Sequence, residues 1–353
     1  MLGFITRAVL VAGAVAGLAG SAFGQAKVVK VDGSSTVYPV SQAVAEEFQN
    51  STKGAIKVTV GNSGTGGGFK KFVRGEIDVS DASRPILKAE MDLAAAAGIE
   101  YIELPICFDA LTVVVNPANT WAETMTVEDL RKIWAPEAQG KITMWNQVRP
   151  EWPAAKITLF GPGTDSGTFD YFTEAVVGKA KSSRGDYTAS EDDNILVKGV
   201  EGDKNSLGYF GFAYYAAHAK KLKAVKISWE KNSLGPVEPS AANVLAGKYN
   251  PLSRPLFIYV NKKAVETRPE VKQFVDFYLK NVANLSAEVK YVPLPASAYA
   301  LVADRFAKLD HGTVFGGHAE VGLTIEEILK RETVSEGKSL GGGDKEPHKD
   351  DKK

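Results

Sequence analysis

A glycine-rich loop at residues 161–172 brings hydroxyl, carboxylate and backbone N–H groups to the start of a helical pattern. Its centre reads Asp165-Ser166-Gly167-Thr168. The first turn of a helix offers free N–H donors and the positive end of the helix dipole, and both favour a small anion. Ser and Thr are also ordinary helix caps, so by itself this loop is more typical of a capped helix with nothing bound.

Two further loops of the same kind strengthen the anion-binding interpretation. One spans residues 32–39 after an apolar strand pattern at 28–31, and the other spans residues 61–68 after an alternating strand pattern at 56–60. Both combine glycine with hydroxyl residues, and both lead into a helical pattern. Three helix starts that aim their N–H groups at one point would hold an oxyanion with neutral dipoles. The three loops together therefore favour an anion site.

The elements that position these loops are strand and helix patterns that alternate along the chain, which favours an α/β fold with mainly parallel sheets. Two similar apolar strand patterns, Leu111–Asn116 and Leu256–Asn261, bracket a middle part with strands and helices of its own. We therefore expect two lobes with a cleft between them. The first lobe would comprise residues 25–110 with 262–334, the second residues 111–261, and the hinge crossings would lie near 111–116 and 256–261.

The composition is that of an ordinary soluble globular protein long enough for two domains, with 353 residues of which 44% are hydrophobic and 24% charged. The 42 basic and 42 acidic residues give a formal net charge of zero, so no basic field favours nucleic acid or an anionic membrane as a partner. An anion site in this chain must rely on local donors. Cys107 is the single cysteine, which excludes an internal disulfide, and its apolar neighbours favour a core position.

Both ends of the chain are expected to lie outside the fold. Residues 1–24 are interpreted as a cleaved secretory signal peptide, because Arg7 precedes the apolar run 8–19 and small residues precede a cut near Gly24. No cysteine follows that run, so we expect no lipid anchor and a soluble periplasmic protein. Residues 335–353 are rich in Gly, Lys and Asp and predict a disordered tail, since such a segment cannot bury apolar surface.

The three loops, in this order and at these intervals, resemble the PstS family, the phosphate-binding proteins of ABC uptake systems. The resemblance runs from about residue 28 to residue 330. Its most specific motifs are Asp-Gly-Ser-Ser-Thr-Val-Tyr-Pro at 32–39, Gly-Thr-Gly-Gly-Gly-Phe-Lys-Lys at 64–71, Asp-Val-Ser-Asp-Ala-Ser-Arg-Pro at 78–85 and Ser-Gly-Thr at 166–168. The resemblance implies a type II periplasmic-binding-protein fold that closes around phosphate.

The resemblance also implies a function and a set of site residues. It implies high-affinity phosphate binding in the periplasm and delivery to the membrane permease of an ABC transporter, by a monomer that is not an enzyme and uses no cofactor or metal. The residues expected to bind phosphate are Ser35, Thr36, the Val37 amide, Thr65, Ser83, Arg84, Asp165, Ser166, Gly167 and Thr168.

The chain departs from the family at two donor positions. Many members carry an Arg shortly before the Ser-Gly-Thr motif, where this chain has Pro162-Gly163, and an Asp in the loop after the third strand, where it has Ser83-Arg84. We therefore expect Arg84 to supply the planar, two-pronged donor that suits phosphate, rather than a surface salt bridge. Two carboxylates are candidates for accepting the phosphate proton: Asp165 first and Asp81 second.

Other interpretations stay open at this stage. A binding protein for sulfate, molybdate or tungstate would share the fold, and a phosphate scavenger or sensor would share the site. A phosphate-ester hydrolase would need metals or an activated nucleophile, and the sequence offers no His-rich or paired-carboxylate pattern with ligand spacing. Residues 191–193, three consecutive acids, are more simply partners of a helix dipole than metal ligands. His311 and His318 lack the further ligands that a metal requires.

Overall fold

The computed structural model describes residues 27–231, 233–318 and 321–322. The predicted signal peptide at 1–24 and the predicted tail at 335–353 lie outside these residues. Within the described residues, no helix combines the length and the apolar character needed to cross a membrane.

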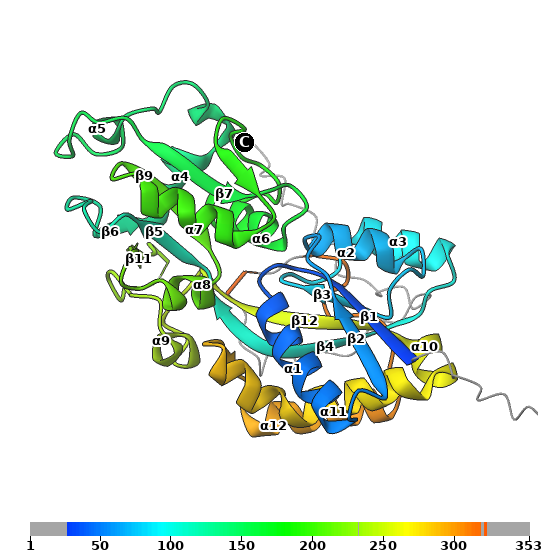
Figure 1. Cartoon of the computed structure of the whole chain (residues 1–353). Helices are drawn as coiled ribbons and strands as arrows, with labels where there is room; N and C mark the ends of the chain where they lie inside the picture. Colours follow the sequence, from blue (N-terminus) through cyan, green and yellow to red (C-terminus); the bar gives the residue numbers. More distant parts are fainter. Residues whose placement is uncertain (1–26, 232, 319–320, 323–353) are drawn as a thin grey trace, which may run out of the picture.

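The first lobe is built on a six-stranded sheet with helices on both faces (Figure 1). In spatial order its strands are β13 (Val292–Pro293), β4 (Tyr101–Ala110), β12 (Ser253–Asn261), β3 (Val79–Ala82), β1 (Lys27–Gly33) and β2 (Ile56–Val60). Its helices are α1 (Tyr38–Ser51), α2 (Thr65–Phe72), α3 (Lys88–Ala96), α10 (Lys262–Thr267), α11 (Pro269–Glu288) and α12 (Ala296–Ala307).

Strand β12 shows why this sheet is buried on both sides. Leu256 and Ile258 belong to the apolar cluster that includes α1 and α11, whereas Phe257 and Tyr259 belong to the cluster that includes α2. The ring of Tyr259 lies 4.9 Å from that of Phe69 on α2. Because alternate residues enter different apolar layers, the strand appears in the sequence as a continuous apolar run.

The second lobe is built on a five-stranded sheet and a two-stranded one. In spatial order the larger sheet contains β10 (Lys223–Ala224), β5 (Thr112–Val115), β9 (Ser206–Phe210), β7 (Thr158–Pro162) and β8 (Thr188–Ser190), and the smaller pairs β11 (Lys226–Ser228) with β6 (Thr124–Thr126). The helices are α4 (Val127–Trp134), α5 (Trp145–Val148), α6 (Gly167–Val177), α7 (Asp193–Gly202), α8 (Phe212–Ala217) and the short 3₁₀ helix η1 (Pro136–Ala138). The short helix α9 (Ala241–Leu245) lies beside β4 and β13 of the first sheet.

The prediction of mainly parallel sheets is corrected to mixed sheets. β1 pairs in parallel with β2 and β3, and β7 with β8 and β9. In contrast, β12 runs antiparallel to both β3 and β4, and β5 runs antiparallel to β9 and β10. The reason is the chain path: β4 carries the chain toward the second lobe and β12 carries it back, so the two neighbouring strands have opposite directions.

The two crossings between the lobes lie side by side. Leu111 alone separates β4 from β5, and residues up to Leu252 precede β12. The Leu111 N–H donates to the Leu252 carbonyl at 2.8 Å, and the Tyr249 hydroxyl donates to the Leu111 carbonyl at 2.9 Å. The expected second crossing at 256–261 is therefore corrected: β12 belongs to the first sheet, and the return crossing precedes it.

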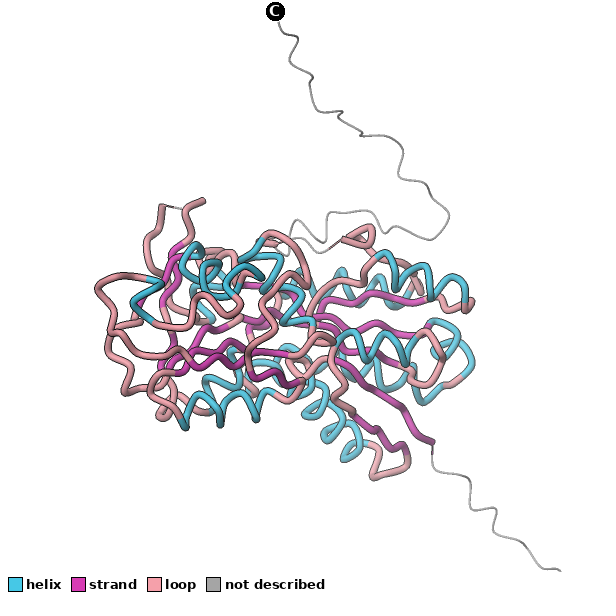
Figure 2. Tube along the Cα trace, turned by 90° about the horizontal axis from the view of Figure 1, so that it is seen from above, coloured by secondary structure: helices cyan, strands magenta, loops and turns pink. Residues whose placement is uncertain are grey.

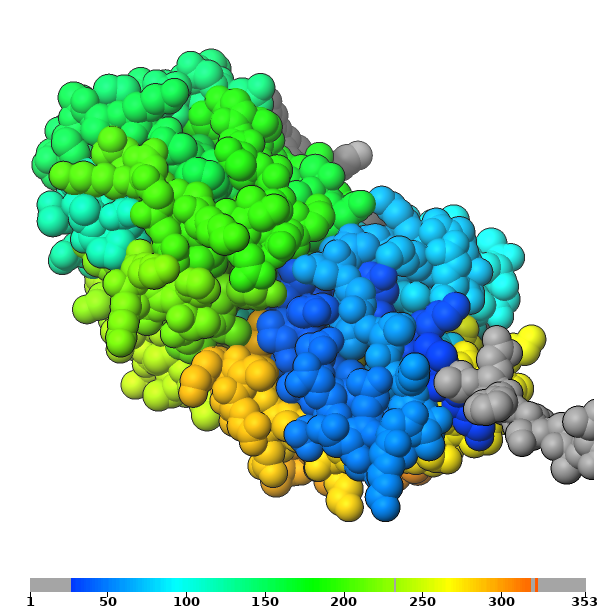
Figure 3. All heavy atoms as spheres, viewed as in Figure 1, coloured from blue at the N-terminus to red at the C-terminus, as the bar shows by residue number. Residues whose placement is uncertain are grey.

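The loops that follow the parallel strands of the two larger sheets face the other lobe. Parallel strands place their carboxyl ends at one edge of a sheet, where ligands bind in open α/β folds. The loop after β1 meets the end of β3, since the Ser34 N–H donates to the Asp81 carbonyl at 3.0 Å. Figure 2 shows the strands of both sheets between their helices, and Figure 3 shows the second lobe (green) in contact with the first (blue).

Candidate anion-binding site

Four buried hydroxyls meet where the two lobes touch. Thr36 Oγ1 lies 2.9 Å from Thr168 Oγ1, and Thr65 Oγ1 lies 3.2 Å from Ser83 Oγ. All four side chains are fully buried. Gly167 lies between the pairs: a Cβ there would be 2.5 Å from Thr65 Oγ1 and 2.6 Å from Ser83 Oγ. Only glycine permits this approach. We call Thr36, Thr65, Ser83 and Thr168 the hydroxyl cluster.

Three helix starts converge on the hydroxyl cluster. Thr36 precedes α1, Thr65 is the first residue of α2, and Thr168 is the second residue of α6. The first N–H groups of each helix have no acceptor inside the helix, and the positive ends of the dipoles add to their effect. The convergence predicted from the three loops is confirmed by these positions.

Two predicted donors have local partners instead. The Val37 N–H donates to the Ser34 carbonyl at 3.1 Å, which closes the turn before α1. The Ser166 hydroxyl accepts a hydrogen bond from the Thr168 N–H at 3.1 Å and caps α6. Both groups therefore fix the backbone that carries the neighbouring donors.

Arg254 on β12 donates hydrogen bonds to the hydroxyl cluster. It was not among the residues predicted from the sequence. Its Nη2 donates to Thr168 Oγ1 at 2.8 Å and to Thr36 Oγ1 at 3.3 Å. Its Nη1 donates to the carbonyls of Ser83 at 3.1 Å and Gly167 at 3.3 Å. The side chain is fully buried. An Arg inside an otherwise apolar strand pattern was the available signal, since such residues are rarely buried without a partner.

Asp109 on β4 is the charge partner of Arg254. The two residues are direct neighbours across the β4/β12 pair. Asp109 Oδ2 accepts from Arg254 Nη2 at 2.9 Å and from Nε at 3.2 Å, and Oδ1 accepts from the Phe212 N–H at 3.0 Å. Because neither side chain of the pair is exposed, Asp109 both orients the guanidinium and offsets its desolvation.

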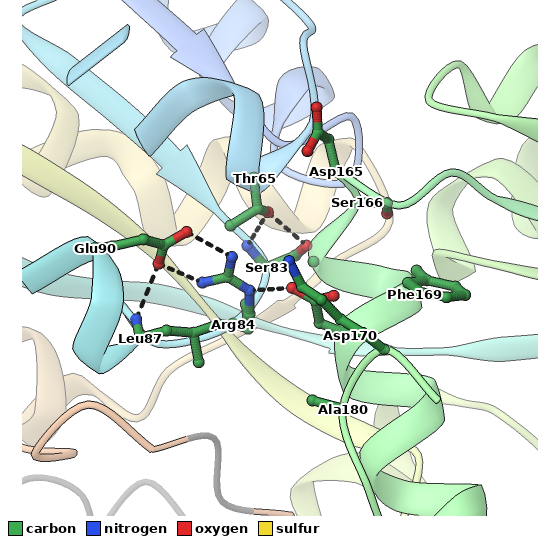
Figure 4. Close-up of polar contacts among 12 residues, drawn as sticks. Thr65, Ser83, Arg84, Leu87, Glu90, Asp165, Ser166, Phe169, Asp170 and Ala180 are labelled. Carbon is green, nitrogen blue, oxygen red and sulfur yellow. Dashed lines mark hydrogen bonds and ion pairs between the residues drawn. The ribbon is translucent and has the colours of Figure 1, made fainter. Parts of the chain in front are cut away.

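Arg84, the predicted guanidinium donor, is bound elsewhere (Figure 4). Its two terminal nitrogens each donate to Glu90 at 2.8 Å, and its Nε donates to Asp170 at 2.5 Å. These carboxylates hold the pKa of Arg84 above its ordinary value. Its neighbour Ser83 enters the hydroxyl cluster, but the Arg84 donors point to the two carboxylates. Since Asp170 lies on α6, the Arg84–Asp170 pair links the two lobes.

The two carboxylates predicted to accept a phosphate proton lie outside the hydroxyl cluster. The Asp165 side chain is 40% exposed and forms an ion pair with Lys70 at 2.8 Å. Asp81 is buried on the α1 side of the sheet, where it accepts from Ser41 Oγ at 2.9 Å, and burial raises its pKa well above the ordinary value. Among the hydrogen bonds of the described residues, none joins either carboxylate to the four hydroxyls.

Ser35, another predicted donor, contacts the carboxylate of Asp193. The sequence predicted that Asp193 would interact with a helix dipole. Ser35 Oγ lies 3.4 Å from Asp193 Oδ2, and Asp193 is 1% exposed. Burial raises the pKa of Asp193 to about 7, and the charge of Arg254 is the largest influence in the opposite direction.

A concavity of about 500 Å³ lies apart from the hydroxyl cluster. It lies in the second lobe between α4, the end of α6 and Trp229. Among residues 27–322 that are described, no three His, Cys, Asp or Glu side chains are grouped so as to hold a metal.

The chain matches a family model described as the PBP superfamily domain over residues 19–282. Protein SphX of Synechocystis sp. is 52% identical over 308 residues, which cover 87% of this chain and 90% of that protein. The phosphate-binding protein PstS of Staphylococcus saprophyticus is 36% identical over 284 residues, which cover 80% of this chain and 84% of that protein.

Solved structures agree with these matches. One is described as a possible phosphate binding protein from Planctomyces limnophilus, with 54% identity, a TM-score of 0.60, and coverage of 80% of this chain and 98% of that one. A second, from Clostridium perfringens, is described as a phosphate ABC transporter substrate-binding protein with bound phosphate. It has 25% identity, a TM-score of 0.63, and coverage of 76% and 100%.

The fold and these matches define a two-lobe solute-binding protein of the PBP superfamily. Within that superfamily, the chain belongs to the PstS family.

Proposed function

We propose that the protein binds one inorganic phosphate at the hydroxyl cluster, between the two lobes, and delivers it to an ABC transporter for uptake. The observation that carries the proposal is the contact of Arg254 with Thr36 of the first lobe and Thr168 of the second. Several short donors around one point suit a tetrahedral oxyanion, and a guanidinium adds a planar, charged donor that matches it. The relatives named for phosphate binding support the same ligand.

The proposed phosphate donors keep six of the ten predicted residues and add Arg254. They are the hydroxyls of Ser35, Thr36, Thr65, Ser83 and Thr168, the N–H of Gly167 and the guanidinium of Arg254. Ser166 and Val37 orient these donors through hydrogen bonds within their own turns. Arg84 and Asp165 link the two lobes beside the donors, through ion pairs with Asp170 and Lys70. A bound anion would accept hydrogen bonds from both lobes at once and so favour their closure about Leu111 and Leu252.

The proposal also covers the cellular location of the protein and its partners. We infer a periplasmic monomer released by cleavage of residues 1–24, with the permease subunits of a phosphate transporter as its partners. It would bind phosphate without transforming it. Clefts between lobes present their ligand when the hinge opens, which suits transfer to a membrane permease.

Isothermal titration calorimetry of the purified protein with inorganic phosphate tests the proposed function. We expect one-to-one binding, with a phosphate-dependent rise in the thermal midpoint. Small-angle X-ray scattering with and without phosphate measures closure. Absence of both heat and thermal shift would overturn the assignment, and turnover of a phosphate ester would favour a hydrolase instead.

A further inference from the structure

The chain passes from the first lobe to the second once more near its described end. On the first lobe, the Gly317 carbonyl accepts a hydrogen bond from the Lys88 N–H at the start of α3, at 3.0 Å. On the second lobe, the Gly322 N–H donates to the Tyr171 hydroxyl of α6 at 3.3 Å. The part of the chain that follows Gly322 therefore starts on the second lobe, beside α6.

The concavity of about 500 Å³ in the second lobe lies next to this point. The partly buried apolar side chains that line it are Ala175, Val177, Trp229 and Val321, and all four also pack against the apolar core. Val321 directly precedes Gly322. Two of the other three lie on α6, the helix that carries Tyr171. An apolar lining that stays partly exposed favours a segment that covers it.

The sequence that follows Gly322 predicts a short amphipathic helix. Residues 323–328 read Leu-Thr-Ile-Glu-Glu-Ile. The Thr and the second Glu have the spacing of a capping box, and the Leu and the second Ile have that of a hydrophobic staple. Ile325, Ile328 and Leu329 then share one helix face. Because so short a helix is marginal in water by itself, that face needs an apolar surface to pack against.

We propose that residues 323–331 dock as a helix in the concavity of the second lobe, with Ile325, Ile328 and Leu329 against its apolar lining. This inference does not depend on the proposed function, because it concerns a surface apart from the hydroxyl cluster. The docked segment attaches the end of the chain to the second lobe, while Gly317 holds the preceding residues on the first. It thereby adds a connection between the lobes to the two crossings described above.

Two observations favour this segment over a separate partner. The segment is attached through Gly322 beside the concavity, so it is present there at a high effective concentration. The charges also allow the contact, because the segment carries two acidic residues at 326–327 and two basic residues at 330–331. The charged residues that line the concavity likewise have both signs: Glu128, Arg131, Glu174, Glu230 and Lys231. Exposed pairs between them would add a modest gain to the apolar contact.

Limited digestion of the purified protein with trypsin, read by mass spectrometry of the C-terminal peptides, tests the proposal. Lys330 and Arg331 lie in the segment, whereas Lys338 lies beyond it and serves as the internal reference. Cleavage requires a locally opened chain, so we expect cutting after Lys330 and Arg331 to be at least about tenfold slower than after Lys338. Phosphate is not needed for this measurement.

Three variants locate the docked segment. Ile328→Asp places a charge on the apolar face of the segment, and Ala175→Glu places one in the concavity, so each should remove the protection. Leu301→Asp is the matched control, because Leu301 is 53% exposed on α12 of the first lobe, and it should keep the protection. Thermal unfolding checks the fold of each variant. If Ala175→Glu does not fold, Trp229→Ala replaces it on the lining.

Several results would overturn the inference and leave the proposed function standing. One is wild type that trypsin cuts as fast after Lys330 and Arg331 as after Lys338. Another is protection that Ile328→Asp removes and Ala175→Glu leaves intact, since the segment would then dock on a different surface. Protection that rises with protein concentration would assign the concavity to the segment of a second copy. Absence of phosphate binding would overturn the proposed function alone.

Discussion

Thr36 and Thr168 meet hydroxyl to hydroxyl at 2.9 Å, although 132 residues separate them and they lie at the starts of helices in different lobes. Arg254 donates to both. These three side chains therefore join the lobes through polar groups that an anion can also engage. The first two predictions test that arrangement by changing one donor at a time.

Arg254→Lys should weaken phosphate binding while keeping the charge. A lysine ammonium cannot reproduce the fork that reaches Thr36, Thr168 and two carbonyls, and one lost charged hydrogen bond costs about 1.5–3 kcal/mol, roughly ten- to a hundredfold in affinity. Arg184→Lys is the matched control, because Arg184 is also buried but bonds to Asp186 and to carbonyls within the second lobe. Equal phosphate affinity of the two variants by calorimetry would exclude Arg254 from the site.

Thr168→Val should weaken phosphate binding by removing one hydroxyl without changing the shape of the side chain. The loss expected for a neutral hydrogen bond is about 0.5–1.5 kcal/mol, roughly two- to tenfold in affinity. Thr173→Val on the same helix is the control, since the Thr173 hydroxyl donates to the Phe169 carbonyl within α6. An affinity in Thr168→Val that matches the control would show that this hydroxyl serves the protein fold alone.

How far the sequence predicted the site can be judged from these same residues. The loops around Thr36, Thr65 and Thr168 were predictable because hydroxyls, glycines and helix starts are local patterns. The Arg254–Asp109 pair was missed because its 145-residue separation is bridged only by the register of β12 on β4. The contacts of Arg84 could not be predicted because Asp170, 86 residues away, is brought to it by the meeting of the lobes.

The ion pairs between the lobes should differ sharply in their contribution to stability. Arg84→Ala leaves two carboxylates without their cation in a buried setting, and the loss of one partner in a buried pair costs about 3–5 kcal/mol of unfolding free energy. Lys70→Ala breaks the exposed pair with Asp165, which should cost about 1 kcal/mol or less. Chemical denaturation of both variants measures the difference, and similar losses would contradict the assignment of Arg84 to a buried structural network.

Protein without phosphate should lose stability as the pH rises from about 4 to above 7, through Asp193. The pKa of this carboxyl is about 7 when folded and about 3.9 when unfolded. Between those values the folded state binds more protons than the unfolded state, so the unfolding free energy falls with pH, by roughly 1.4 kcal/mol per pKa unit of difference. Burial raises the pKa of Asp81 too, with the same sign.

Thermal unfolding of wild type and Asp193→Asn at pH 5 and pH 8, without phosphate, measures this contribution. The variant has no charge to bury, so its stability relative to wild type should be greater at pH 8 than at pH 5. An equal difference at the two pH values would show that Asp193 ionises as freely in the folded protein as in the unfolded chain.

The adjacent crossings at Leu111 and Leu252 make the second lobe an insertion into a β-hairpin. Ala110 and Ser253 are already paired across β4 and β12, so a two-residue turn between them would close that hairpin without the intervening chain. The resulting single-lobe protein would keep Thr36, Thr65, Ser83 and Arg254 on one sheet edge. A chain shortened in this way would test whether the first lobe folds by itself and what it alone contributes to recognition.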